Sequence, residues 1–304
     1  MTTSPSNGEL QTDRRLCVLS IGGHPKDVVL YAGGTMALHV ERGDVVVALT
    51  PTYGVSHHEK AVAAFKRGEP IDIEAAKQER MQELTEACAE LGVTDVRCLG
   101  YDDDVPMVGR RIVEGIADVI LDVRPDFVIT HHPNDSVVMH GVTGQMTLIA
   151  LETARTIRED GKLPHSVRQV FFHTQIGRTN VIEQDNPRIP SIIIDITPTV
   201  RKKATAMNRF ESQHYGRNSP LQRKLGEVLD GSIYGIHRRV PYAETFLPLD
   251  ANVYRSLPFS EYEFELDERT EEETYANMTQ MLLDDFAPGS DGQQMAGAVD
   301  KGSL

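Results

Sequence analysis

His24 and Asp27 are the first residues along the chain whose types and spacing suit chemistry. They follow an apolar run, Leu16–Ile21, and stand where a helix is expected to begin, so a three-residue spacing lets both side chains converge on one point. An imidazole and a carboxylate together suit zinc or another divalent first-row metal. A second interpretation stays open, because Asp27 can simply cap the helix while His24 is an ordinary loop histidine.

Residues 131–140 are a second polar loop, placed between a predicted strand and a predicted helix. The loop contains three histidines, the last of them His140, together with Asp135. If its strand neighbours the first strand, these side chains can complete a three-ligand site that leaves one position open for water. The alternative is that the same polar residues cap and solvate an ordinary loop.

Apolar runs that alternate with helical patterns are expected to position both loops. Near-continuous apolar strands separated by helices favour an α/β fold, in which a mostly parallel sheet has helices on both faces. Active sites of such sheets lie at the carboxyl ends of the strands, where both polar loops fall. Strands are predicted at 16–21, 44–50, 96–99, 126–130, 169–173 and 191–196, and helices at 28–41, 74–91, 110–123 and 144–160.

The remaining segments have weaker patterns. Residues 51–70 are expected to form a mobile substrate loop in which His57 and His58 lie at the surface. The acidic run 102–104 is typical of a solvated turn. Helical patterns continue from 198 to about 229, residues 241–246 are expected to form an edge strand whose Tyr242 and Glu244 contribute to the cleft wall, and residues 268–286 are expected to form an acidic helix.

Length, charge and composition exclude several classes of protein. The 304 residues, 40% of them hydrophobic, suffice for a buried core. Residues 261–304 carry a net charge of −10 out of the total of −14, so the rest of the chain is only slightly acidic. A basic footprint for nucleic acid is absent. No apolar run is long enough to span a membrane, and three scattered cysteines predict a cytoplasmic location. We expect a flexible leader at 1–13, a catalytic domain at 14–260 and an acidic tail at 261–304, and a homo-oligomer is possible.

The order of several short motifs resembles the LmbE/PIG-L family. The segment from Gly22 to Asp27 with the following Gly33-Gly34-Thr35 is similar to that family's opening motif, a His-Pro-Asp-Asp-Glu string followed by Gly-Gly-Thr. The stretch from Pro133 to His140, with Thr143-Gly144 after it, is similar to the second metal-binding motif. The similarity extends in order over about residues 14–250.

The resemblance implies a Rossmann-like sheet and a zinc site with His24, Asp27 and His140 as ligands. A one-residue slip in the alignment would place Met139 at the third ligand position instead. Arg80, in the predicted helix 74–91, matches a family position that commonly contacts substrate. A small-molecule substrate is therefore expected, and an anionic one would suit these cationic side chains, to which Arg217 is a further candidate.

Three residues depart from the family pattern and affect the expected mechanism. Lys26 stands where family deacetylases have the general base, Val28 replaces the family's Glu, and Val137 replaces a histidine assigned to the oxyanion. A protonated lysine cannot take a proton from water, although burial near a metal can lower its pKa. Lys26 can otherwise hold an anion, or it is a solvated loop residue paired with a neighbour.

The leading hypothesis is a zinc-dependent hydrolase that cleaves an N-acyl bond of a small molecule, with Asp135 as the candidate base. The missing first Asp is also similar to a divergent branch of the family, the 4-oxalomesaconate hydratases. A hydratase that adds water to an unsaturated oxo-dicarboxylate is therefore the first alternative. The second is a family member that has lost catalysis and kept a binding cleft.

Overall fold

One seven-stranded sheet organises the chain, with its strands in the order β3-β2-β1-β4-β5-β7-β6. The computed structural model describes residues 14–104, 106–174, 191–213, 215, 229, 231–235, 238–254, 260–270 and 272–273. The five strands from β3 to β5 are parallel, and β7 is antiparallel to both of its neighbours. The predicted mostly parallel sheet is confirmed. The strands are β1 (Cys17–Ile21), β2 (Val45–Thr52), β3 (Asp95–Tyr101), β4 (Phe127–Thr130), β5 (Gln169–His173), β6 (Ile192–Asp195) and β7 (Ala243–Pro248).

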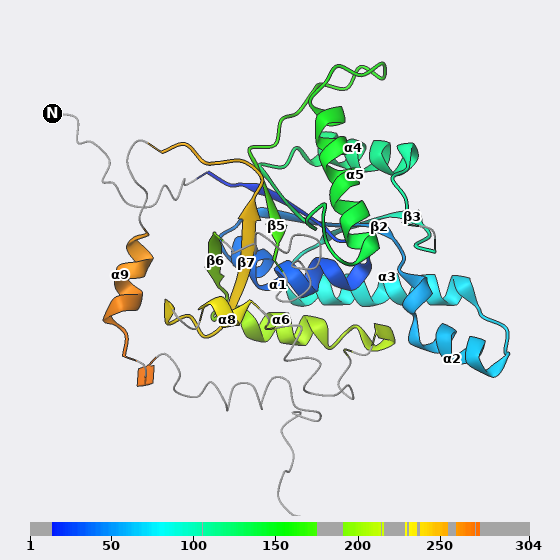
Figure 1. Ribbon diagram of the computed structural model, residues 1–304, viewed down its shortest axis with the longest axis horizontal. Helices are drawn as coiled ribbons and strands as arrows, with labels where there is room; N and C mark the ends of the chain where they lie inside the picture. The colour runs from blue at the N-terminus through cyan, green and yellow to red at the C-terminus, as the bar shows by residue number, and fades with distance from the viewer. Residues whose placement is uncertain are drawn as a thin grey trace, which may run out of the picture.

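Helices cover both faces of this sheet (Figure 1). On one face α1 (Pro25–Glu41), α3 (Ile73–Glu90) and α6 (Val200–Met207) contact one another, and on the other α4 (Arg110–Val123) packs against α5 (Val138–Ala154). Successive strand residues point to opposite faces. In β1, accordingly, Val18 joins the core under α1, whereas Leu19 and Ile21 join the core under α4 and α5.

Two helices that border the polar loops begin earlier than predicted. α1 begins at Pro25 rather than at 28, because proline has a φ suited to the first helical position and no N–H to leave unpaired there. α5 begins at Val138 rather than at 144 and ends at Ala154. Gly144 permits this, since a Cβ at that position would lie 2.5 Å from the carbonyl oxygen of His131. The glycine thus lets the helix approach the polar loop closely.

The segment predicted as a loop at 51–70 contains regular secondary structure, so the loop prediction was wrong, whereas its role toward substrate stays a prediction. β2 extends to Thr52, and a 3-10 turn, η1 (Val55–His57), leads into α2 (Glu59–Arg67). The His58 ring accepts the N–H of Ala61 at the start of α2, and Gly68 ends the helix in the left-handed conformation that glycine favours. The cap at the start and the glycine at the end make a short helix possible, although none of its side chains is buried.

The C-terminal strands also differ from the expectation. The segment predicted as an edge strand at 241–246 is β7, which lies between β5 and β6, so that β6 is the edge strand. Glu244 and Tyr242 are almost fully buried rather than part of a cleft wall. The Glu244 carboxylate accepts the backbone N–H groups of Gly34 and Thr35 in α1 and pairs with Lys203 of α6 at 2.8 Å. It therefore joins three elements inside the core.

Several predictions concern residues outside the described part of the chain. These are the leader at 1–13, Arg217, and most of the predicted helix at 268–286 with the tail beyond it. Within the described part, the remaining short helices are η2 (Glu211–Gln213), α8 (Ser232–Gly235) and α9 (Glu261–Glu268). The division into leader, catalytic domain and tail stays a prediction. Among the described residues, no helix combines the length and the hydrophobicity that a membrane span requires.

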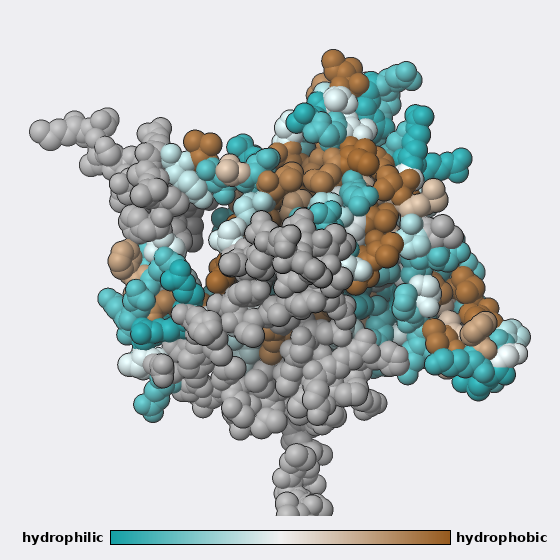
Figure 2. Space-filling view, in the orientation of Figure 1, coloured by the Kyte–Doolittle hydropathy of each residue, from teal (hydrophilic) through white to brown (hydrophobic). Residues whose placement is uncertain are grey.

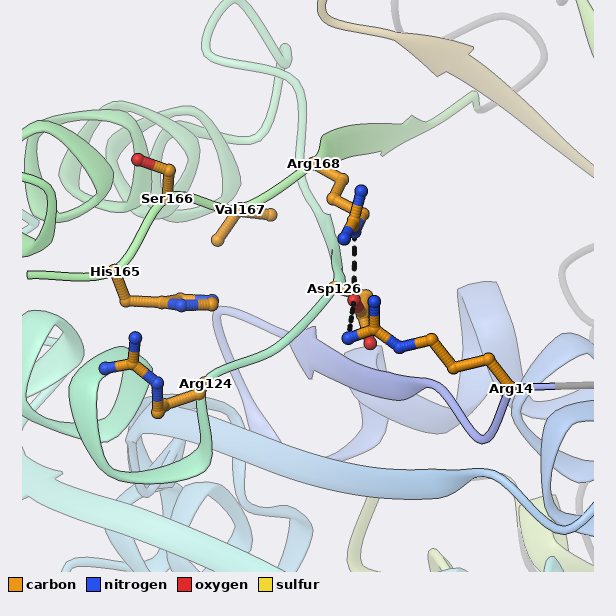
Figure 3. A pocket seen from close by; sticks show the side chains of 7 residues that line it. All are labelled: Arg14, Arg124, Asp126, His165, Ser166, Val167 and Arg168. Carbon is orange, nitrogen blue, oxygen red and sulfur yellow. Dashed lines mark hydrogen bonds and ion pairs between the residues drawn. The ribbon is translucent and has the colours of Figure 1, made fainter. Parts of the chain in front are cut away.

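Asp126 fastens the amino ends of three neighbouring strands. It accepts hydrogen bonds from Arg14, which precedes β1, from Arg168, which precedes β5, and from the backbone N–H of Cys17. Figure 3 shows both guanidinium groups turned toward this carboxylate at a surface pocket of about 550 Å³. The pocket lies at the edge of the sheet opposite the polar loops. Arg14 and Arg168 pair with Asp126 there, and Arg124 donates to the backbone carbonyls of Leu163 and Pro164.

Apolar side chains gather on the outer side of α5 and on the loop after it (Figure 2). Val138 and Ile149 are exposed on the helix, and Ile157 and Leu163 are 91% and 77% exposed on the loop. An exposed apolar area of this kind is typical of a contact surface between proteins. Assembly into a homo-oligomer nevertheless stays a prediction, because the structure contains a single chain.

Candidate metal centre

The two polar loops meet because their strands are adjacent. β1 and β4 pair in parallel through Val18–Ser20 and Phe127–Ile129, so their carboxyl ends lie at the same edge of the sheet. His24 and Asp27 follow β1, with Asp27 in the first turn of α1, and His140 lies in the first turn of α5. Local sequence thus begins both helices at the place where the chain brings their first turns together.

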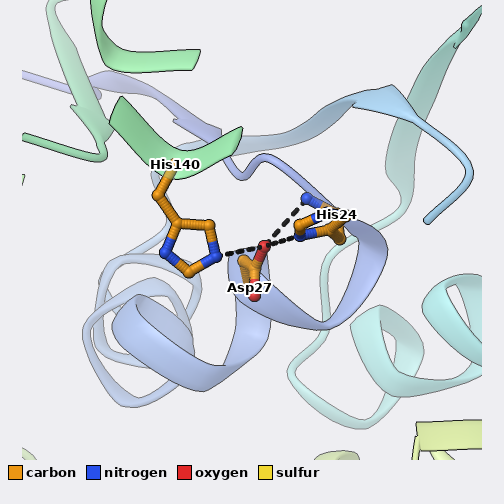
Figure 4. Close-up of side chains that lie close together, drawn as sticks. All are labelled: His24, Asp27 and His140. Carbon is orange, nitrogen blue, oxygen red and sulfur yellow. Dashed lines mark hydrogen bonds and ion pairs between the residues drawn. The ribbon is translucent and has the colours of Figure 1, made fainter. Parts of the chain in front are cut away.

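His24, Asp27 and His140 converge on one point (Figure 4). Oδ2 of Asp27 lies 2.8 Å from Nδ1 of His24 and 3.3 Å from Nε2 of His140. One ligand atom from each residue lies within 4.8 Å of the others. Asp27 is fully buried, His140 nearly so, and the His24 side chain is 13% exposed. The predicted trio is therefore brought together, with one side open to solvent at His24.

The charges of this cluster are strongly coupled. Burial alone would raise the pKa of the Asp27 carboxyl, but the positive charges of His140, His24 and Lys26 hold it well below its usual range. Burial likewise would lower the pKa of His140, but attraction to Asp27 and hydrogen bonds to Asp135 and Asp27 raise it to about 9. The buried carboxylate therefore stays charged and needs a positive partner.

These residues fit a divalent metal. Oδ1 of Asp27 is buried and has no hydrogen-bond partner among the described residues, although Nζ of Lys26 lies 3.6 Å away. Oδ2 already accepts the backbone N–H of His24, so Asp27 also caps α1. Asp27 can therefore cap the helix through Oδ2 and still serve as a metal ligand. One carboxylate and two imidazoles form a donor set that suits zinc and its neighbours.

A second possible trio consists of His131, Asp135 and His140, all buried. The His131 ring stacks on His140 with 4.0 Å between centroids, and its Nε2 accepts the backbone N–H of Gly23. That hydrogen bond assigns the ring proton to Nδ1, which faces Asp135 Oδ2 at 3.9 Å. A protonated nitrogen has no lone pair for a metal, so the geometry favours the first trio.

Asp135, predicted as the base, lies against the outer side of His140. Its Oδ2 is 3.5 Å from Nδ1 of that ring, and its Oδ1 accepts the backbone N–H of Val137. Nδ1 is the nitrogen of His140 that does not face Asp27. The carboxylate is therefore placed to orient the imidazole, and its role as base stays a prediction.

Lys26 lies at the rim of the cluster. Its ammonium is 3.6 Å from Asp27 Oδ1 and 5.4 Å from the centre of the Tyr215 ring. Of the other two departures from the family pattern, Val28 is completely buried in the core, and Val137 directly precedes α5. Of the three departures from the family pattern, Lys26 alone places a charged group at the site.

Arg80 extends from α3 into a buried environment. The residue is fully buried, and none of its three guanidinium nitrogens has a hydrogen-bond partner among the described residues. Burial lowers its pKa to about 10, while the negative charges of Glu83, Asp103 and Asp27 act in the opposite direction. A buried cation with five unpaired N–H donors is an unusual feature, because such donors are normally satisfied.

Asp103 and His58 were predicted to be solvated and are not, whereas the sequence already made His173 a candidate for the cleft. Asp103, expected in a solvated turn, is buried with its Oδ2 3.6 Å from Nε2 of His24. His58, expected at the surface, is buried and lies 3.2 Å from Glu79, whereas His57 is exposed. His173 packs against Tyr31 and His131 with ring centroids about 5 Å apart. The place of His173 at the end of the predicted strand 169–173 had indicated that its side chain could face the cleft.

Comparison with known proteins finds a family model that matches part of the chain. Residues 19–151 match the sequence model of the PIG-L family, which is described as GlcNAc-PI de-N-acetylase. This span includes both polar loops and Arg80. Residues 19–151 thus resemble a PIG-L-type domain. The resemblance to the LmbE/PIG-L family that the motifs predicted is confirmed.

Individual relatives of the PIG-L-type domain are named as deacetylases. The chain is 27% identical over 204 residues to a probable N-acetyl-alpha-D-glucosaminyl L-malate deacetylase 2 of Bacillus cereus, covering 64% of this chain and 83% of that protein. It is 33% identical over 169 residues to a 1D-myo-inositol 2-acetamido-2-deoxy-alpha-D-glucopyranoside deacetylase of Thermomonospora curvata, covering 47% and 55%. The prediction of an LmbE/PIG-L-type enzyme agrees with these names.

Solved structures have the same fold as the PIG-L-type domain. The 4-carboxy-2-hydroxymuconate hydratase of Pseudomonas putida has a TM-score of 0.62 at 24% identity, covering 80% of this chain and all of the other. The N,N'-diacetylchitobiose deacetylase of Pyrococcus horikoshii has a TM-score of 0.61 at 21% identity, covering 77% and 83%. At these identities the likeness concerns the fold, and it includes both a deacetylase and a hydratase.

Proposed function

We propose that this protein is a metal-dependent hydrolase that cleaves an N-acyl bond of a small molecule. The convergence of His24 Nδ1, Asp27 and His140 Nε2 carries this proposal. When bound there, zinc or a similar divalent ion would polarise a carbonyl and lower the pKa of water. The position left open by a three-residue donor set is the usual place for such a water.

The protein's own residues would orient the ligands and the substrate. Asp135 would hold the His140 ring through Nδ1, which is 3.5 Å away. The backbone N–H of His24 and the start of α1 would hold Asp27 in place. The contacts of Asp135 support an orienting role better than the predicted role as base. We therefore propose that Asp135 orients the His140 ring. Lys26 stands at the rim, where its charge can attract an anionic group.

Arg80 supports an anionic substrate. Its guanidinium group is buried and unpaired among the described residues, and a substrate carboxylate or phosphate would satisfy its N–H donors in a bidentate contact. The Bacillus cereus relative is named for a glucosaminyl L-malate compound, and malate carries two carboxylates. Relatives named as deacetylases further support an N-acyl bond as the target.

A hydratase is the second candidate, and Lys26 favours it. The residue stands in the position of the family's base, and its ammonium lies 3.6 Å from Asp27. A cation beside the metal ligands suits the negative charge of an enolate-like intermediate better than it suits proton abstraction from water. An unsaturated oxo-dicarboxylate would then contact Lys26 and Arg80. A non-catalytic binding protein remains the third reading of the same departures.

Two assays on zinc-loaded protein distinguish these activities. Release of acetate from N-acetylglucosamine derivatives, with and without an acidic substituent, is the expected result for the hydrolase. A change in ultraviolet absorbance of an unsaturated oxo-dicarboxylate, without acetate release, would replace the hydrolase by the hydratase. Loss of the observed activity in His140→Ala and its persistence in His57→Ala, a variant of an exposed histidine near the site, would link it to the metal centre.

A further inference from the structure

The ring of His24 has carboxylates on both of its nitrogens. Nδ1 lies 2.8 Å from Asp27 Oδ2, and Nε2 lies 3.6 Å from Asp103 Oδ2. Asp103 comes from the segment after β3, far from α1 in the sequence, so the contact is made by the fold. If His24 binds metal through Nδ1, Nε2 must carry the ring proton, which then faces Asp103. A contraction of about half an ångström would bring the pair into hydrogen-bonding range.

The surroundings of Asp103 hold its carboxylate in this position. The residue is 8% exposed, whereas Asp102 and Asp104 on either side are exposed. Oγ of Ser56 donates a hydrogen bond to Oδ2 of Asp103, and the Ser56 backbone N–H donates to Oδ1 at 3.3 Å. A buried carboxylate needs such partners, and two donors from η1 supply them. The side chain is therefore fixed before any ligand binds.

His140 is arranged in the same way. Its Nε2 faces Asp27, and its Nδ1 faces Asp135 Oδ2 at 3.5 Å. Each imidazole of the metal site thus has one nitrogen toward Asp27 and the other toward a separate buried carboxylate. Carboxylates that accept the outer N–H of a ligand histidine fix its tautomer and increase its basicity, and their loss typically lowers metal affinity about 10–100-fold.

We propose that Asp103 is a positioning residue that fixes the tautomer and the ring orientation of His24 for metal binding, held in turn by Ser56. This inference rests on the proposed metal-dependent function and extends it to a residue outside both metal-binding motifs. It also connects the metal ligand to the segment of η1 and α2, because Ser56 belongs to η1. Asp103 itself acts only through His24.

The test compares zinc affinity by competition with a chromophoric chelator in the wild-type protein, Asp103→Ala, Asp103→Asn and Ser56→Ala. We expect about 10–100-fold weaker binding for Asp103→Ala, with smaller losses for the other two. Asp102→Ala is the matched control, since that neighbouring carboxylate is 68% exposed, and it should bind zinc like the wild type. Circular dichroism and thermal unfolding of the metal-free proteins show that each variant is folded.

A spectroscopic readout separates positioning from general loosening. In zinc-loaded wild-type protein, ¹⁵N NMR should show His24 with its proton on Nε2 and a slowly exchanging N–H signal, which shifts or exchanges faster in Asp103→Asn but stays in Asp102→Ala. Zinc binding by Asp103→Ala equal to the wild type, or an Nε2–H signal unchanged in Asp103→Asn, overturns the inference and leaves the proposed function intact. A wild-type protein that binds no zinc overturns both.

Discussion

Single residues in the site depart from ordinary protein interiors, and Lys26 and Arg80 are the clearest cases. Most buried polar groups are hydrogen-bonded, yet the guanidinium of Arg80 has no such partner among the described residues. The resemblance predicted both residues as functional, Lys26 within the opening motif and Arg80 at a family position in the predicted helix 74–91. It did not predict that Arg80 would be completely buried, because burial of a helical arginine depends on the elements packed against it.

The first prediction at this scale concerns Arg80. Arg80→Met should raise KM for an anionic substrate about 10–100-fold, because a charged hydrogen-bonded contact contributes about 1.5–3 kcal/mol, with a smaller change in kcat. Steady-state kinetics on the active substrate measures it. Arg110→Met, which changes an exposed arginine at the start of α4, is the control and should leave KM unchanged. An unaltered KM in Arg80→Met would remove Arg80 from the substrate site.

A second prediction concerns the pH dependence of stability at His173. Burial and the charge of His140 lower the pKa of His173 to about 3, so the folded protein keeps this ring neutral. The unfolded chain takes up the proton near pH 6.5, and the stability that the neutral ring contributes is therefore lost as the pH falls from about 6.5 toward 3. The effect amounts to at most about 1.4 kcal/mol per pH unit.

The measurement is thermal unfolding of metal-free protein between pH 7.5 and pH 4. His173→Phe should lose less stability over this range than the wild type, because phenylalanine takes up no proton. His165→Phe is the control, since that half-buried ring donates a hydrogen bond from Nε2 to the backbone carbonyl of Pro125. Parallel curves for the wild type and His173→Phe would show that His173 does not contribute to acid sensitivity.

At the scale of elements, local sequence patterns predicted where strands and helices occur better than they predicted which strands lie side by side. The runs at 169–173 and 191–196 were recognised as strands, but the place of β7 between them was not. Antiparallel pairing of residues 48 to 77 positions apart in the sequence leaves no local signal. The helix α2 was missed because it buries none of its side chains.

The ion pair between Glu244 and Lys203 allows a prediction about how β7, α6 and α1 are joined. Both side chains are 2–3% exposed, and Glu244 also accepts two N–H groups of α1. Glu244→Leu should destabilise the protein by about 3–5 kcal/mol, because the Lys203 charge is left buried without its partner. Adding Lys203→Met should recover part of this loss. Urea unfolding of both variants tests it, and a double variant no more stable than Glu244→Leu would contradict the account.

At the scale of the whole molecule, the sequence predicted an α/β fold with two polar loops at one edge, and the fold is confirmed. What it could not supply are contacts made only by packing. Asp103 lies beside His24 because β3 and β1 are both neighbours of β2, and His131 lies under His140 because Gly23 and Gly144 allow close approach. The metal-binding motifs can be recognised from the order of residues in the chain. The residues that surround the metal ligands can be recognised only from the folded structure.

Metal binding to this fold should also change its overall stability. A ligand that binds the folded state alone stabilises it by about 4 kcal/mol at a thousand times its dissociation constant. Zinc should therefore raise the Tm of the chelator-treated protein, and renewed chelation should reverse the rise. His24→Ala should show little of it. An equal rise in that variant would indicate that zinc stabilises the protein from another place.

The metal content of purified protein tests the central claim most directly. Elemental analysis of protein prepared without chelator, and after reconstitution with zinc, should give one metal ion per wild-type chain. His24→Ala, Asp27→Ala and His140→Ala should each lose it, whereas His57→Ala should retain it. A folded wild-type protein without stoichiometric metal, or full metal content in all three ligand variants, would contradict the assignment of a metal centre to these residues.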